Sequence, residues 1–155
     1  DGDFSYKEGQ WDQTGTQGKG LRLETHIEAG LRIQGDADKL ARIFDNLLRN
    51  AVSYSHENTT IELSAVHSEQ WVQISVRNQG DRIPTQKLER LFEKFYRVDT
   101  SRGSASGGAG LGLAIAKQLV ELHQGTIEAG STEDYTEFTV RLPQQPKRET
   151  KAPLV

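Results

Sequence analysis

The feature that most constrains the fold is the stretch between Gly35 and Ser55, in which apolar residues return every three or four positions. An α-helix turns once in about 3.6 residues, so this spacing gathers the apolar side chains on one face. Asp36 stands at the start, where its side chain can accept hydrogen bonds from the free amides of the first turn. The sequence predicts a helix whose buried face is formed by Leu40, Ile43, Phe44, Leu47, Leu48, Ala51 and Val52.

Length and charge restrict the class of protein. The chain has 155 residues, which favours one domain. No apolar run approaches the roughly 20 residues that span a bilayer. The formal net charge of -3 is spread without a basic block, which argues against nucleic acid as a partner. There is no cysteine, which excludes disulfides, thiolate nucleophiles and cysteine zinc sites; we expect the cytoplasm as the compartment.

The two ends of the chain differ in composition from its middle. Residues 1–20 are polar and glycine-rich, which is typical of a domain boundary or of a segment foreign to the protein. Residues 144–155 are polar and contain proline, which is typical of a flexible tail. We therefore expect one folded domain at 21–143.

The remaining elements mix strands and helices without strict alternation. Two β-rich runs separated by a polar turn predict an antiparallel hairpin at 60–66 and 71–77. Apolar spacing predicts one more helix at 85–94 and another directly after the small-residue loop 98–110. Shorter strands are expected at 21–27 and 31–34, around a turn, and at 126–129 and 136–142. The mixture favours an α+β fold, a two-layer sandwich of a mixed sheet and three main helices, over a doubly wound parallel sheet.

The polar side of the helix after Asp36 has an unusual composition. Asn46, Asn50 and Tyr54 are four residues apart, so they lie on one line along the helix, at the border of its apolar face. An asparagine oxygen is a neutral hard ligand that suits Mg²⁺ when phosphates supply the charge balance. The pattern indicates a metal and phosphate site; for a single asparagine, a solvated helix surface is the more frequent explanation.

A glycine-rich run, GGAGLG at 107–112, joins the small-residue loop to the following helix. Glycines let backbone amides approach an anion closely, and a helix N-terminus adds free N–H groups and the positive end of the helix dipole. The run lacks the Gly-Lys-Ser/Thr end of a Walker loop, and no strand immediately precedes it as in a Rossmann turn. It indicates phosphate binding, with a flexible hinge as the alternative.

A third segment, VRNQGDRIP at 76–84, follows a strongly predicted strand. The strand ends in a short polar residue, Asn78, and Gly80 then allows the backbone to pass close to a planar ligand. Taken alone, this segment would be an ordinary turn.

Together these segments resemble the GHKL superfamily (gyrase, Hsp90, histidine kinase, MutL), in its histidine-kinase branch. DNLLRNAVSYS at 45–55 is similar to the N box and VRNQGDRIP to the G1 box. LFEKFYRVD at 91–99 is similar to the F box, and GGAGLGLAIAK at 107–117 to the G2 box. The resemblance runs from about 21 to 142, and within the branch the chain looks most like the VanS-type sensor kinases of vancomycin resistance.

The resemblance implies a Bergerat-type sandwich that holds ATP between the N-box helix and a mobile lid at 98–109. It implies that Asn50 binds Mg²⁺, that Asn46 lines the phosphate site and that Arg97 lies near the phosphates. Tyr54 would pack at the adenine. The nucleotide-binding residues implied by motif position are Asn50, Tyr54, Asn78, Gly80, Gly108, Gly110, Leu111, Gly112 and Thr136.

The sequence departs from the family pattern at four places. Asn78 stands where the G1 box has an aspartate that accepts a hydrogen bond from the adenine amine, so we expect weaker adenine binding. Arg82 replaces the second G1 glycine, and Ser53 replaces a lysine that often precedes the N-box tyrosine. The last glycine box is absent, with Asp134 and Tyr135 in its place.

The resemblance also implies a division of labour with other domains. Hydrolytic relatives carry a glutamate at the position of Asn46, and an amide cannot act as a base, so we expect no gyrase-like hydrolysis. The four histidines do not lie in a phosphoacceptor motif. We therefore expect the γ-phosphate to pass to a histidine on a dimerisation domain absent from this chain, and then to a cognate response regulator.

The chain would then be the cytoplasmic part of a membrane-anchored sensor. Two alternatives remain open at the level of sequence. One is a degenerate nucleotide-binding or protein-interaction module, suggested by Asn78 and Ser53. The other is a serine kinase of the anti-sigma type, which shares the fold.

Overall fold

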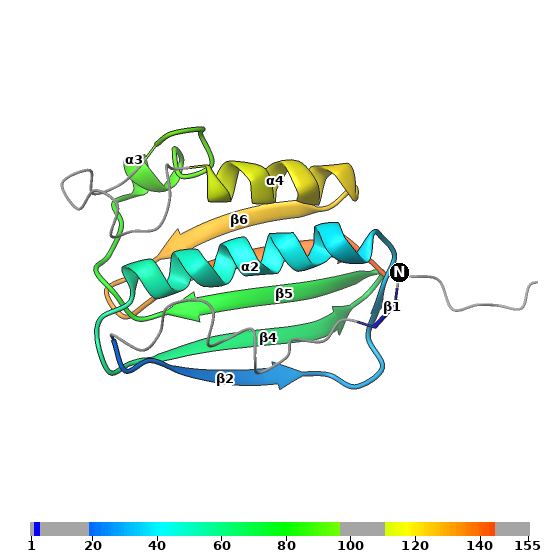
Figure 1. Cartoon of the computed structure of the whole chain (residues 1–155), viewed down its shortest axis with the longest axis horizontal. Coiled ribbons are helices and arrows are strands. Elements are labelled where there is room, and N and C mark those ends of the chain that lie inside the picture. Colours follow the sequence, from blue (N-terminus) through cyan, green and yellow to red (C-terminus); the bar gives the residue numbers. More distant parts are fainter. Residues whose placement is uncertain (1, 4–18, 97–110, 145–155) are drawn as a thin grey trace, which may run out of the picture.

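The fold is built on a main sheet that is covered on one side by helices. The computed structural model describes residues 2–3, 19–96 and 111–144. Helices α2 (Ala37–Tyr54) and α4 (Gly112–Leu122) lie on the same face of the sheet and run in opposite directions (Figure 1). A one-turn helix, α3 (Thr85–Leu88), lies near one end. The predicted α+β sandwich with three helices is confirmed.

The main sheet is mixed. Its five strands are ordered β2-β4-β5-β7-β6, with bounds β2 Arg22–Ile27, β4 Thr60–Ser68, β5 Trp71–Asn78, β7 Thr136–Pro143 and β6 Thr126–Ser131. β2 is parallel to β4, and the other neighbouring pairs are antiparallel. A separate two-stranded sheet pairs β1 (Gly2–Asp3) with β3 (Arg32–Ile33). The predicted hairpin of β4 and β5 is therefore confirmed.

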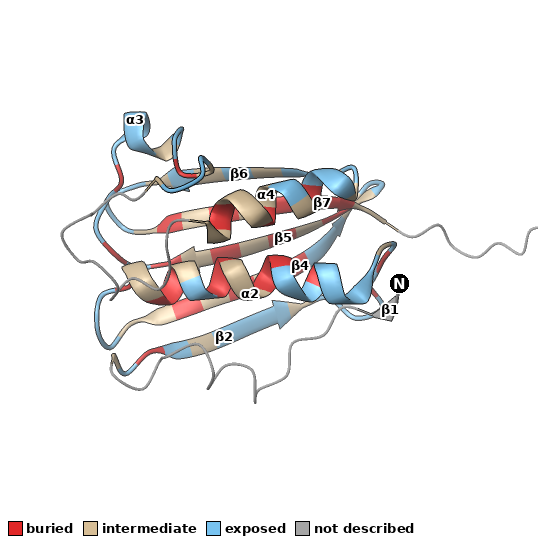
Figure 2. Ribbon diagram, turned by 45° about the horizontal axis from the view of Figure 1, so that its top comes forward, coloured by how far each residue is buried: buried red, intermediate tan, exposed pale blue. Residues whose placement is uncertain are grey.

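The central strands alternate between buried and less buried residues, as expected when one face of a sheet is covered. On β5 and β7 the buried side chains face each other in register, for example Val76 opposite Phe138 and Ile74 opposite Val140. Figure 2 shows the buried residues concentrated where α2 and α4 meet the sheet. This single core holds the helices in fixed positions over the strands.

Helix α2 agrees with its sequence pattern in full. All seven apolar residues predicted for its inner face are buried. The carboxylate of Asp36 accepts hydrogen bonds from the amides of Asp38 and Lys39, at 2.9 and 3.1 Å. The bond from the Lys39 amide is the main cause of a lowered pKa of the Asp36 carboxyl group. The helix therefore begins where its cap residue dictates.

Helix α4 packs against α2, and its residues Leu113, Ala116 and Val120 are buried. It ends in a turn in which Gln124 has a φ of 64° and the amide of Gly125 donates to the carbonyl of Val120. A left-handed residue followed by such a bond is a common way to end a helix. The helix predicted directly after the loop at 98–110 is confirmed.

One prediction about local structure was wrong in part. The helix predicted at 85–94 ends after one turn, and the next bonds join residues three apart, as from Leu91 to Leu88. Leu91 and Phe92 pack against the core, and Phe92 meets the ring of Phe138 edge-on. Phe95, just beyond this segment, has a φ of 67° and is 67% exposed, so the chain has turned away from the core before it.

The two strands predicted around the turn at Ala29-Gly30 both form, but they do not pair with each other. β2 extends the main sheet beside β4, whereas β3 pairs with β1. Alternation within each short run indicated strands and carried no information on their partners.

Candidate nucleotide site

One end of the sheet gathers most of the residues singled out in the sequence. The C-terminal end of α2, the end of β5, the start of β7 and the N-terminus of α4 all lie there (Figure 1). Arg97, Gly108 and Gly110 fall outside the described residues, whereas Leu111 and Gly112 are described. The site can therefore be built from α2, α4, β5 and β7.

Asn46 lies where α4 begins. A Cβ on Gly112 would be 3.7 Å from Oδ1 of Asn46, so this end of α4 rests against the middle of α2. Leu111 occupies the N-cap position, and its side chain makes no cap bond. The first hydrogen bond of the helix runs from the amide of Ile115 to the carbonyl of Leu111. The amides of the first turn have no partner within the helix, which creates a positive end suited to an anion.

The side chain of Asn46 is itself poised for a ligand. Its Nδ2 atom is buried and has no hydrogen-bond partner. An unpaired buried amide costs about 1–3 kcal/mol, which a ligand oxygen would recover. Asn50 and Tyr54 follow at one and two turns along α2, and both are half-buried.

The C-terminal end of α2 is fixed by a lysine that the sequence analysis missed. The ammonium group of Lys19 donates to the carbonyls of Val52, Ser53 and Ser55 at 2.8, 2.9 and 3.1 Å. These carbonyls belong to the end of the helix, where a positive charge is stabilising. Lys19 belongs to the polar, glycine-rich segment at 1–20. No local sequence pattern predicts its contact with the end of a helix more than thirty positions further along the chain.

Gly80 joins the end of β5 to the end of α2. It is buried, and a Cβ at this position would overlap the carbonyl group of Tyr54. The amide of His56 donates to the carbonyl of Gln79 at 2.8 Å, which ties the same two segments together. The close backbone approach that Gly80 permits is thus one between β5 and α2.

Asn78 and Thr136 form a buried polar pair. They are opposite each other on β5 and β7, and they are 2% and 3% exposed. Nδ2 of Asn78 is buried without a hydrogen-bond partner. Oγ1 of Thr136 lies 2.7 Å from Oγ of Ser131, which accepts a bond from the amide of Ile83 at 2.9 Å. Ser131 was not predicted; it stands at the end of a weakly patterned strand, where its sequence context resembles any turn.

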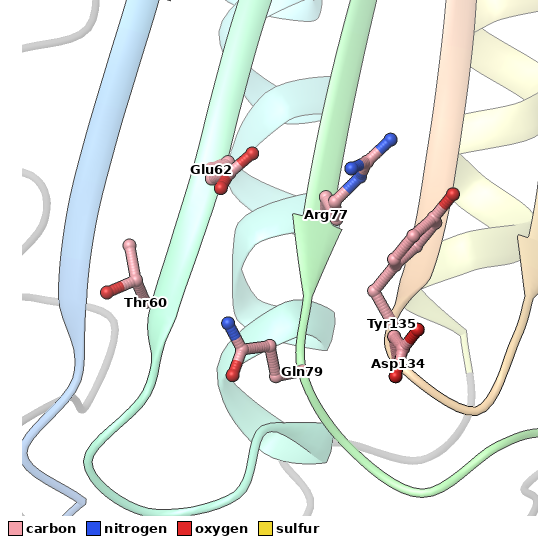
Figure 3. A pocket seen from close by; sticks show the side chains of 6 residues that line it. All are labelled: Thr60, Glu62, Arg77, Gln79, Asp134 and Tyr135. Atoms are coloured by element: carbon pink, nitrogen blue, oxygen red, sulfur yellow. The ribbon is translucent and has the colours of Figure 1, made fainter.

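The opposite face of the sheet carries a different feature. A hollow of about 340 Å³ is lined by Thr60, Glu62, Arg77, Gln79, Asp134 and Tyr135. Figure 3 shows these side chains on the side away from the helices. The guanidinium carbon of Arg77 is 3.8 Å from the ring centre of Tyr135, and its Nη2 is 3.2 Å from a carboxylate oxygen of Glu137. The sheet separates this hollow from Asn78 and Thr136, so it is no part of the candidate nucleotide site.

The site contains little that could hold a metal by charge alone. Among residues 2–3, 19–96 and 111–144, no three histidine, aspartate or glutamate side chains gather as metal ligands. A cation at this site would therefore rely on amide oxygens and on oxygens of a bound phosphate.

Among the residues that the structure describes, no helix is both long and apolar enough to cross a membrane.

Sequence comparison assigns the family. A model described as "Histidine kinase-, DNA gyrase B-, and HSP90-like ATPase" matches residues 35–146, which include α2, β5, α4 and β7. The chain is a member of this ATPase family. The GHKL resemblance drawn from the four motifs is confirmed.

Relatives among sensor proteins support the same conclusion. The chain is 48% identical over 127 residues to sensor protein VanS of Enterococcus faecium, covering 82% of this chain and 33% of VanS. It is 40% identical over 139 residues to sensor histidine kinase WalK of Bacillus subtilis, covering 83% of this chain and 23% of WalK. The chain thus spans about a third or less of the length of these relatives.

Solved structures show the same fold. The mycobacterial sensor histidine kinase MprB has a TM-score of 0.73 at 24% identity, covering 90% of this chain and 95% of that one. The catalytic domain of histidine kinase ThkA has a TM-score of 0.74 at 23% identity, covering 89% and 92%. Full-length ShkA in complex with AMPPNP has a TM-score of 0.73 at 28% identity, covering 95% and 31%. The chain has the fold of a sensor histidine kinase catalytic domain.

Proposed function

We propose that this chain is the ATP-binding catalytic domain of a sensor histidine kinase, which binds Mg-ATP and donates the γ-phosphate to a histidine outside the chain. The observation that carries the proposal is a pair of buried amide nitrogens without a hydrogen-bond partner, Nδ2 of Asn46 beside the start of α4 and Nδ2 of Asn78 beside β7. Unsatisfied buried donors are rare in folded proteins and mark places where a ligand completes the hydrogen bonding.

The phosphates would bind at the first of these places. The free amides at the start of α4 and the Nδ2 of Asn46 are donors suited to phosphate oxygens. Asn50, one turn further along α2, would supply an oxygen to Mg²⁺, which neutralises charge on the phosphates as they transfer. Arg97, Gly108 and Gly110 would complete the phosphate site from the segment outside the described residues.

The base would bind at the second place. Asn78 and Thr136 offer polar groups at the buried end of β5 and β7, and Tyr54 stands at the adjoining end of α2. The complex of ShkA with AMPPNP, an ATP analogue, supports the choice of nucleotide, because ShkA shares this fold.

The arrangement favours a phosphate donor over a hydrolase. Asn46 carries no carboxylate, and its neighbour Asp45 is bound to Arg49 at 2.8 Å on the exposed side of α2. Water activation needs a base within reach of the phosphate, and this part of α2 offers none.

The acceptor histidine would belong to another part of the same protein. None of the four histidines of this chain lies in a phosphoacceptor motif. In the fold, His123 is held by the carbonyl of Leu119 and the amide of Asp36, and the other three have exposed contacts with Glu24, Asp81 and Gln144. We propose a dimerisation domain with the phosphoacceptor as one partner and a response regulator as the other. The catalytic domain would extend over 21–143, on the cytoplasmic side of a membrane-anchored sensor.

A degenerate binding module is the second candidate, favoured by the replacement of the family aspartate by Asn78. Calorimetric titration of the purified chain with ATP, with and without Mg²⁺, separates the two. The kinase proposal predicts binding that strengthens with Mg²⁺. Absence of any heat of binding, from a chain that circular dichroism shows to be folded, would favour the degenerate module.

A further inference from the structure

Asn78 differs from most buried polar residues in that no hydrogen bond from its amide nitrogen fixes the orientation of the side chain. Its side chain is 2% exposed, and its Nδ2 has no hydrogen-bond partner. The oxygen and nitrogen of an asparagine amide are nearly equal in size, so a half-turn about the last side-chain bond exchanges a donor for an acceptor. The group can therefore present either polarity to a ligand at little cost.

The neighbouring hydroxyl groups share this property. Oγ1 of Thr136 and Oγ of Ser131 are 2.7 Å apart, and either can be the donor. The amide of Ile83 donates to Oγ of Ser131, which leaves the proton of Ser131 free to point toward Thr136. When Ser131 donates, Thr136 can give its own proton to a ligand; when Thr136 donates to Ser131, only lone pairs remain for the ligand.

The surroundings suit a neutral heterocycle. Along β5 and β7 the next residues on the same face are Val76 and Phe138, which are 1% exposed, and the buried Ile83 follows in the adjoining loop. A charged phosphate would be poorly solvated at such a place. A purine base, which is flat and carries donors and acceptors along one edge, fits the chemistry of the pair.

An amide complements two kinds of purine edge. Adenine presents a 6-amino donor next to the N1 acceptor, and an asparagine can accept from the first and donate to the second. A 6-oxopurine, such as hypoxanthine or guanine, presents an acceptor next to an N1–H donor, and the same amide matches it after a half-turn. A carboxylate offers acceptors alone, so in the position where it accepts from the 6-amine of adenine it would face the 6-oxo group of the other purines unfavourably, and its one favourable contact there would be with N1–H.

We propose that Asn78, Ser131 and Thr136 form a purine-reading group of reversible polarity, through which the chain binds 6-oxopurine nucleoside triphosphates as well as ATP. This inference rests on the proposed function, because it takes the base to bind beside Asn78. It goes beyond that function by assigning the substrate class.

The test compares ATP with inosine triphosphate, which carries the 6-oxo group without the bulky 2-amino group of guanine. Calorimetry with excess Mg²⁺ gives the ratio of the two dissociation constants for the purified chain. We expect the wild type to bind both within about tenfold of each other. Asn78→Asp should shift the ratio by at least about tenfold in favour of ATP. Asn58→Asp, which adds the same charge at an exposed position, should leave the ratio unchanged.

A buried carboxylate could unfold the chain, so a second variant keeps the test decisive. Asn78→Ala should weaken both nucleotides by several-fold, with the melting temperature measured as a check on the fold. Asn50→Ala should weaken both equally through the phosphates.

Discrimination of more than about tenfold against inosine triphosphate by the wild type would overturn the inference and leave the proposed function standing. Unchanged affinities in Asn78→Ala, or an unchanged ratio in a folded Asn78→Asp, would also overturn it. Failure of both nucleotides to bind the wild type would reject the proposed function together with the inference.

Discussion

Gly80 and Tyr54 are packed backbone to backbone, so closely that a single added carbon on Gly80 would overlap the carbonyl group of Tyr54. This contact fixes the end of β5, where Asn78 stands, against the end of α2. The position of the candidate base site relative to Asn50 therefore depends on the backbone contact that Gly80 permits.

Replacing this glycine should separate the two elements. Gly80→Ala is expected to lower the free energy of unfolding by roughly 1–3 kcal/mol, because the methyl group must push α2 and β5 apart. Urea denaturation measures the change. Gly130→Ala is the matched control, since a Cβ at Gly130 meets nothing within 4 Å. Equal effects of the two substitutions would show that the contact at Tyr54 is not restrictive.

Asn50 separates ligand binding from stability. Asn50→Ala is expected to weaken Mg-ATP by at least about tenfold, or about 1.4 kcal/mol, because the metal loses a ligand on α2. The melting temperature should hardly change, since the side chain is only half-buried. Arg42→Ala, an exposed substitution on the same helix, controls for changes in the helix itself. An affinity that stays the same with Mg²⁺ present would reject the metal assignment.

Leu47 tests the position of the helix on the sheet. It is fully buried on the inner face of α2. Leu47→Ala should therefore lower the free energy of unfolding by roughly 2–5 kcal/mol, through the lost contacts and the cavity left behind. Leu122→Ala provides the contrast, because Leu122 is 63% exposed at the end of α4. Thermal and urea melts of both variants measure the difference. A small effect at Leu47 would mean that the inner face of α2 is assigned wrongly.

The sequence predicted those elements that depend on interactions between residues close together in the chain. Helix α2 was predicted residue by residue because its cap and its apolar spacing are local properties of the chain. The hairpin of β4 and β5 was predicted for the same reason. The partners of β2 and β3 were not, because the alternation of a short strand is compatible with any neighbour.

The residues of the candidate site also divide into those that local motifs predict and those that depend on contacts between distant segments. Asn46, Asn50, Asn78 and Thr136 could be named from motif resemblance, and the structure brings Asn78 and Thr136 together in one register pair. Lys19 could not, since its bonds reach residues more than thirty positions away. Ser131 could not be named either. Its role depends on the loop after β5, which brings the amide of Ile83 within hydrogen-bonding distance of its hydroxyl group.

The strongest consequence of the proposed function is that the isolated chain should be chemically inactive while binding its nucleotide. Asn46 offers no base for water, and none of the four histidines lies in a phosphoacceptor motif, so neither phosphate release nor self-phosphorylation is expected. Incubation with γ-labelled ATP and Mg²⁺ should label no protein until a separate phosphoacceptor helix domain, with its histidine intact, is added. Label should then appear on that domain and not on its His→Ala variant. Steady phosphate release by the chain alone, persisting in Asn46→Ala, would instead assign a hydrolase whose base lies on another element.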